Sequence, residues 1–126
     1  MVGRTVSARR KILLVDDSAL VRAVVVHALV ASGLEVTTIE DPRAIDDAVA
    51  KFSPDLLLVD ATFPGVTDNE LIATLTAHSA SLPVVLFSDR PESEVRALVA
   101  SSGARGFVPK DGATLVERLT PFLPSS

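Results

Sequence analysis

Short apolar runs alternate five times with segments of helical periodicity, and this alternation limits the possible folds more than any other feature of the chain. The apolar runs cover residues 11–16, 34–39, 56–60, 82–88 and 106–109. The first, third and fourth runs are continuously apolar, which is typical of strands buried on both faces of a parallel sheet. Five strand–helix units in succession predict an α/β fold, a doubly wound five-stranded parallel sheet with helices on both faces.

The segments between the apolar runs carry helix signals. Apolar residues recur at helical spacing from Leu20 to Leu29, and Gly33 suits a C-terminal cap. Asp41 and Pro42 fit the N-cap and first position of a second helix. The second helix is expected to run from this cap to about residue 52. The remaining expected helices cover about residues 67–78, 91–103 and 112–122. The alternating run 34–39 is expected at an edge of the sheet, and the run 56–60 at its centre.

Composition and charge narrow the possible functions. A chain of 126 residues predicts one domain, expected over residues 11–124 after a basic arm at residues 1–10. The absence of cysteine excludes thiolate metal sites and disulfides. Beyond Lys11 the chain has 8 basic against 16 acidic residues, which argues against direct nucleic-acid binding. No apolar stretch is long enough for a signal peptide or a membrane span, so a cytoplasmic location without membrane contact is expected.

Polar side chains follow the expected strands where each strand ends. They are Asp16 and Asp17 after the first, Asp60 after the third, Ser88 after the fourth and Lys110 after the fifth. Ligands of open parallel sheets bind beyond the carboxyl ends of the strands, so these residues are expected to form one site. Taken singly, an aspartate or serine could merely cap a helix and Lys110 could be a solvated charge. A carboxylate ending a strand as apolar as 56–60, however, needs a partner.

This set of side chains has a definite chemistry. Three converging carboxylates repel one another unless a cation or a proton is present, and oxygen ligands favour Mg²⁺ or Mn²⁺. Ser88 can donate a hydrogen bond to a phosphoryl group, and Lys110 supplies a compact positive charge. A carboxylate can also attack phosphorus and form an aspartyl phosphate. The site therefore suits phosphoryl transfer or the binding of its product.

The motifs, in their order along the chain, resemble those of the receiver domain of two-component response regulators over residues 11–123. They are Val15-Asp16-Asp17-Ser18, Leu58-Val59-Asp60 with Pro64-Gly65, Phe87-Ser88, and the segment 103–110 ending in Pro109-Lys110. The resemblance implies a flavodoxin-like receiver fold with strand order 2-1-3-4-5. Because the chain shows no output domain, it is expected to be a stand-alone receiver.

The resemblance also implies roles for individual residues. Asp60 would be the phosphoacceptor, supplied by a histidine kinase, a phosphotransfer protein or a small phosphodonor. Asp16, Asp17, Asp60 and the backbone carbonyl of Thr62 would hold Mg²⁺, while Ser88 and Lys110 would bind the phosphoryl group. Ser88 and Phe107 would act as switch residues, and an output protein would bind the fourth helix, fifth strand and fifth helix. Such a chain would assist its own phosphorylation and dephosphorylation without being an enzyme.

Two residues depart from the family pattern. Asp111 follows Lys110 where proline in a cis peptide bond is usual, so either this bond is trans or the loop is strained. Asp111 could instead cap the last helix. Asp89, directly after Ser88, places a negative charge near the entrance of the site, which could slow the reaction with anionic phosphodonors. These departures leave a second hypothesis, a pseudo-receiver that binds proteins without being phosphorylated.

Enzymes and cofactor proteins of similar architecture fit less well. A flavin site would need a phosphate-binding loop after the first strand, where this chain has two aspartates. A phosphatase of the haloacid dehalogenase type would need an Asp-x-Asp spacing there, and the chain has no P-loop. His27 and His78 lie on expected helices without metal-ligand spacing, so both are interpreted as structural.

Overall fold

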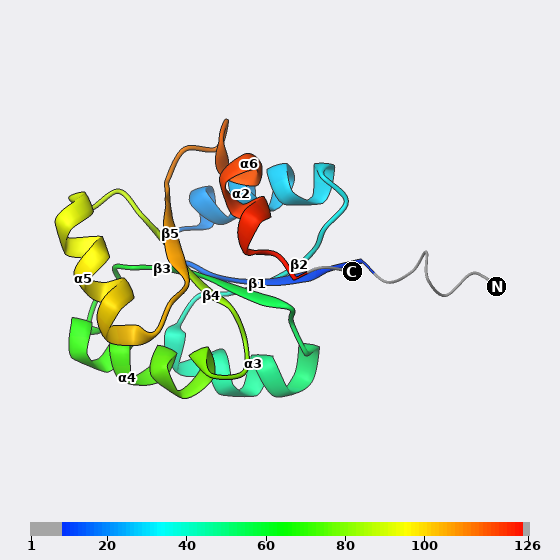
Figure 1. Cartoon of the computed structure of the whole chain (residues 1–126). Coiled ribbons are helices and arrows are strands. Elements are labelled where there is room, and N and C mark those ends of the chain that lie inside the picture. The colour runs from blue at the N-terminus through cyan, green and yellow to red at the C-terminus, as the bar shows by residue number, and fades with distance from the viewer. Residues whose placement is uncertain (1–8, 125–126) are drawn as a thin grey trace.

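Five parallel strands form one sheet in the order β2-β1-β3-β4-β5 in the computed structural model, which describes residues 9–124 (Figure 1). The strands are β1 Lys11–Val15, β2 Glu35–Ile39, β3 Leu56–Asp60, β4 Val84–Ser88 and β5 Gly106–Pro109. The predicted fold class and strand order are confirmed, with β2 at an edge and β3 at the centre. Most of the expected basic arm, residues 1–8, lies outside the described residues.

Five α-helices connect or follow the strands. They are α2 Ala19–Ala31, α3 Ile45–Phe52, α4 Asp68–Ser79, α5 Glu92–Ser102 and α6 Leu115–Leu119, with 3-10 turns η1 Pro42–Ala44 and η2 Thr120–Phe122. Gly33 ends α2 as expected, since its φ of 87° lies in the left-handed region that glycine adopts freely. Asp41 accepts the N–H of Arg43 at the start of η1, so the second helix begins as a 3-10 turn.

The last helix begins later than expected. Residues 112–114 form turns around Asp111, whose carboxylate accepts the Ala113 N–H at 3.1 Å and the Thr114 hydroxyl at 3.2 Å. The Thr114 N–H also bonds to the Asp111 carbonyl, and α6 starts at Leu115. The expectation that Asp111 caps this helix is wrong in position, because Thr114 is the N-cap residue and the Asp111 carboxylate bonds within the preceding turns. An Asp-Gly pair favours turns over a first helical turn.

Two hydrophobic layers hold the helices on the sheet. Side chains of one face, such as Leu14 and Leu58, pack with α2 and α6, while Leu13 and Leu57 of the other face pack with α3, α4 and α5. Figure 1 shows these two groups of helices above and below the sheet. Because successive strand residues point to opposite faces and both faces are covered, β1, β3 and β4 must be apolar at consecutive positions.

The register of the strands determines where the site lies. Val15 of β1 is paired with Val59 of β3, Asp60 with Phe87 of β4, and Ser88 with Pro109 of β5. The strands therefore end almost level, and the residues that follow them meet at one edge. Within residues 9–124, no helix is both long enough and apolar enough to cross a membrane.

Candidate functional site

Asp60 lies at the middle of the candidate site, at the end of the central strand. Its side chain is nearly inaccessible to solvent, and both carboxylate oxygens are hydrogen-bonded. Oδ1 accepts a hydrogen bond from the N–H of Thr62 at 3.0 Å, and Oδ2 accepts one from Lys110 Nζ at 2.8 Å. Burial raises the pKa of Asp60 above its ordinary value, although the hydrogen bonds from Lys110 and Thr62 oppose this effect.

Asp16 and Asp17 come from the loop between β1 and α2. Asp16 is fully buried, and its Oδ1 accepts the N–H of Ser18 at 2.8 Å. Ser18 in turn caps α2 by accepting the N–H of Val21. Because Ser18 occupies the N-cap position, neither aspartate is needed for the helix. The alternative that one of them merely caps the first helix therefore does not hold.

The three aspartates could together hold a metal ion. One carboxylate oxygen of each of Asp16, Asp17 and Asp60 lies within 4.8 Å of the others. Oδ2 of Asp16 is buried and accepts no hydrogen bond from any described residue, and the nearest cation, Lys110 Nζ, is 3.9 Å away. A buried carboxylate oxygen without a partner costs free energy, which a cation at this point would remove. Oxygen ligands alone fit Mg²⁺ or Mn²⁺.

Lys110 reaches the aspartates from the loop after β5. Its ammonium group also lies 5.4 Å from the centre of the Phe87 ring, a distance at which a cation is attracted to the face of an aromatic ring. Burial lowers the pKa of Lys110, but its hydrogen bond to Asp60 and the charges of Asp60, Asp16 and Asp89 outweigh burial and raise it. The Lys110–Asp111 peptide bond is trans, as no cis bond occurs in the described part of the chain. A proline after the lysine is therefore not needed to place this side chain.

Ser88 and Phe107 occupy the positions expected from their strands. Ser88, at the end of β4, is buried, and its Oγ accepts the N–H of Arg90 at 2.9 Å. Phe107 of β5 is half-buried against the core beneath α5, with the Arg96 guanidinium 5.8 Å from its ring centre. Asp89 is exposed. The structure thus brings Asp16, Asp17, Asp60 and Lys110 together, with Ser88 beside them, while the ring of Phe107 packs against the core.

Comparison with known proteins gives the family. The response regulator receiver domain matches this chain over residues 12–120, nearly the whole described length. The chain belongs to the response regulator receiver family. In fold, this receiver matches chemotaxis protein CheY4 of Vibrio cholerae with a TM-score of 0.80 and 28% sequence identity, covering 92% of this chain and 100% of that one.

Curated relatives of this receiver are longer regulators. It is 31% identical to the C4-dicarboxylate transport transcriptional regulatory protein DctD of Pseudomonas aeruginosa, over 82% of this chain and 22% of that protein. It is 30% identical to the DNA-binding transcriptional regulator NtrC of Escherichia coli, over 82% of this chain and 23% of that protein. The chain therefore spans less than a quarter of the length of these two relatives.

The resemblance to receiver domains places Arg90, like Thr62, at a variable position that tunes how long the phosphate lasts in such domains, but the sequence did not predict its contacts. Its guanidinium bonds to the carbonyl of Ala61, directly after Asp60, and to the carboxylates of Asp68 and Glu94. The spacing of four between Arg90 and Glu94 is a sequence signal for their ion pair, although Arg90 lies before the first residue of α5. Nothing in the sequence indicates the contacts with Ala61 and Asp68, which come from another loop and another helix.

The raised pKa of Asp60 has a consequence for stability. A buried acid with a raised pKa in the folded state favours folding when protonated, so its ionisation lowers the free energy of unfolding as pH rises above about 3.8. Without metal at pH 7, Asp60→Asn is expected to raise the free energy of unfolding, and this gain is expected to shrink toward pH 4. Thermal unfolding in a chelator at several pH values measures it. The exposed Asp47→Asn is the control, and an Asp60→Asn protein less stable than wild type at pH 7 would contradict the prediction.

Proposed function

We propose that this receiver is a metal-dependent phosphoacceptor in two-component signalling, with Asp60 as the residue that is phosphorylated. One observation carries the proposal: the buried Asp60 carboxylate lies beside Lys110 and within 4.8 Å of the carboxylates of Asp16 and Asp17. Three acids gathered at the end of a strand carry excess negative charge, which opposes folding unless a cation is bound. Membership of the receiver family supports the same function.

Asp60, Lys110 and Ser88 each have a separate role in the proposed reaction. One Asp60 oxygen attacks the phosphorus of a phosphohistidine, the P–N bond breaks, and its electron pair returns to the imidazole nitrogen. When Asp60 becomes phosphorylated, its carboxylate loses its negative charge, and the ammonium group of Lys110 then pairs with a phosphoryl oxygen. Ser88 donates its hydroxyl proton to another phosphoryl oxygen, which its position at the end of the neighbouring strand β4 allows.

Asp16, Asp17, Asp60 and the backbone carbonyl of Thr62 would hold Mg²⁺, or Mn²⁺ in its place. The bound ion supplies positive charge that offsets the negative charge of the transferring phosphoryl group. The unpaired Oδ2 of Asp16 supports this assignment, because the hydrogen bonds of the described residues leave it without a partner.

The phosphodonor would be a histidine kinase or a histidine phosphotransfer protein, and the signal would leave through a protein surface. Added phosphoryl charge at Asp60 would bias the loops after β4 and β5 between two arrangements, with Ser88 and Phe107 as the moving side chains. The surface for an output protein is the fourth helix, fifth strand and fifth helix, here α5, β5 and α6. The chain is thus a signalling switch that assists its own phosphorylation and dephosphorylation rather than an enzyme acting on a separate substrate.

Intact-mass measurement after incubation with phosphoramidate tests this function directly. We expect one phosphoryl adduct in the presence of Mg²⁺ and none in a chelator, because the acidic site repels an anionic donor without the cation. Failure to form an adduct with folded protein and Mg²⁺ would favour the pseudo-receiver. In that case the charge of Asp89 at the edge of the site is the first feature to remove.

A further inference from the structure

Arg90 is held by more hydrogen bonds than any other arginine in the described residues. Nη1 donates to the Ala61 carbonyl at 3.2 Å and to Asp68 Oδ1 at 3.1 Å, and Nη2 donates to Asp68 Oδ2 at 3.1 Å. Nη2 and Nε both donate to Glu94 Oε1, at 3.0 and 3.2 Å. All five N–H groups of the guanidinium are therefore used, which holds the side chain in one orientation.

The two ends of Arg90 touch both sides of the candidate site. Its backbone N–H bonds to Oγ of Ser88, and its guanidinium bonds to the carbonyl of Ala61. Ala61 lies between Asp60 and Thr62, so the second bond restrains the loop after β3 next to the phosphoacceptor. Arg90 thus links the loop after β3 to the loop after β4, at the point where these strands end.

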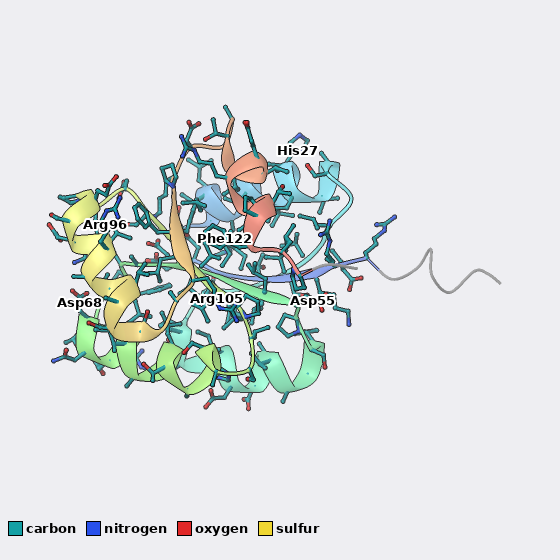
Figure 2. The ribbon with its side chains drawn as sticks, viewed as in Figure 1. His27, Asp55, Asp68, Arg96, Arg105 and Phe122 are labelled. Carbon is teal, nitrogen blue, oxygen red and sulfur yellow. The ribbon has the colours of Figure 1, made fainter. Side chains whose placement is uncertain are left out.

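Two carboxylates orient the guanidinium toward this loop. Asp68, labelled in Figure 2, lies in the first turn of α4 beside α5, and it binds Arg90 through both oxygens. Glu94 lies in the first turn of α5. A bidentate carboxylate selects the planar arginine fork, and a lysine at position 90 could not make the same set of bonds. The arrangement is specific to arginine.

The loop after β3 depends on this restraint when the site is in use. Two N–H groups of this loop are also bonded: that of Ala61 to the Phe87 carbonyl of β4, and that of Thr62 to Oδ1 of Asp60. Of these two bonds, the one from Thr62 uses the carboxylate of the site. A metal ion or a phosphoryl group draws on the same carboxylate oxygens and so competes with that bond. The Arg90 bond to Ala61 uses no atom of Asp60 and persists whatever Asp60 binds.

We propose that Arg90 is a positioning residue that holds the backbone of residues 61–62 against the metal site, so that metal affinity depends on its guanidinium. The inference rests on the proposed function, because the Thr62 carbonyl is one of the proposed ligands. Residues that orient a metal ligand through hydrogen bonds commonly change metal affinity by about 10–100-fold.

Arg96, on the helix that follows Arg90, offers a matched control. It pairs with Glu92 four residues away, as Arg90 does with Glu94, but its bonds do not reach the loop after β3. Both arginines carry the same charge, Arg90 in the loop before α5 and Arg96 on α5 itself. A difference between Arg90→Lys and Arg96→Lys therefore reports the geometry of the contact with Ala61 and not the charge of the helix.

The experiment measures Mg²⁺ binding to the full chain by isothermal titration calorimetry. Arg90→Lys is expected to raise the Mg²⁺ dissociation constant roughly 10-fold. Arg96→Lys is expected to leave it within about twofold, as befits an exposed ion pair. Asp68→Asn, which removes the carboxylate that orients Arg90, is expected to weaken binding in the same direction and to add nothing in the Arg90→Lys background. The amide NMR signals of Ala61 and Thr62 are expected to shift in Arg90→Lys and not in Arg96→Lys.

Equal Mg²⁺ affinity in wild type and Arg90→Lys would overturn the inference, and so would equal losses in Arg90→Lys and Arg96→Lys. A wild-type chain that binds no Mg²⁺ would overturn both this inference and the proposed metal dependence. A wild-type chain that binds Mg²⁺ but forms no phosphoryl adduct would overturn the proposed function alone, because the role of Arg90 is measured on metal binding.

Discussion

Asp60→Asn is expected to abolish the phosphoryl adduct completely. The amide of asparagine fills the same volume, and its oxygen can still accept one of the hydrogen bonds that Thr62 and Lys110 donate to the two oxygens of Asp60. An amide oxygen is, however, a far weaker nucleophile than a carboxylate. Loss of the adduct in a folded Asp60→Asn protein would therefore reflect the missing nucleophile and not a defect in folding. The measurement is intact mass after incubation with phosphoramidate and Mg²⁺, with thermal unfolding of the same samples to show that the variant is folded.

Asp55 supplies the matched control for this experiment. It precedes β3 as Asp60 ends it, so the two aspartates lie at opposite ends of the same strand, and Asp55 accepts the Lys11 N–H at 2.7 Å (Figure 2). Asp55→Asn is expected to form the adduct like wild type. An adduct that persists in Asp60→Asn, or one that disappears in Asp55→Asn, would show that another residue accepts the phosphoryl group.

Asp17→Asn is expected to weaken Mg²⁺ binding by at least about 10-fold. Even the loss of a residue that only orients a metal ligand commonly lowers metal affinity by about 10–100-fold. Asp17 is the exposed member of the three aspartates, so its substitution leaves the buried pair of Asp16 and Asp60 in place. At an Mg²⁺ concentration near the wild-type dissociation constant, adduct formation is expected to slow by a similar factor. Excess Mg²⁺ is expected to restore it. Calorimetric titration and the time course of the adduct measure the two effects.

Asp89→Asn distinguishes a ligand from a nearby charge. Asp89 is also exposed at this edge of the sheet but does not belong to the carboxylate cluster. We expect its substitution to change Mg²⁺ affinity by less than about threefold, as a screened surface charge would. Adduct formation from an anionic donor is expected to accelerate slightly, because one repulsive charge is removed. Equal losses of Mg²⁺ affinity in Asp17→Asn and Asp89→Asn would indicate general electrostatic attraction rather than ligation.

Most of the fold was predictable because the core imposes a pattern on the chain. The buried residues of β1 and β3 must be apolar at consecutive positions, since both faces of the sheet are covered, and helices must show apolar residues at a spacing of three or four. The start of the last helix was not predictable from that pattern. There the Asp111 carboxylate bonds to Ala113 and Thr114, and these local bonds compete with a helical turn.

The candidate site, like the fold, could be predicted from the sequence only in part. Asp16, Asp17, Asp60, Ser88 and Lys110 follow apolar strands, and a parallel sheet brings the ends of its strands to one edge, so their proximity follows from the sequence pattern. The roles of these residues remain proposals for the experiments above. Their proximity, however, required no knowledge of individual contacts.

The sequence by itself determined the order of strands and helices and the side chains that meet at the carboxyl edge, because both depend on periodicity and on position along a strand. The tertiary structure alone decided that Oδ2 of Asp16 has no hydrogen-bond partner among residues 9–124, that Lys110 reaches Asp60 although its peptide bond to Asp111 is trans, and that Arg90 bonds to the loop after β3. These features join segments far apart in the chain. Their geometry depends on how helices and loops pack together, and no local pattern of residues encodes it.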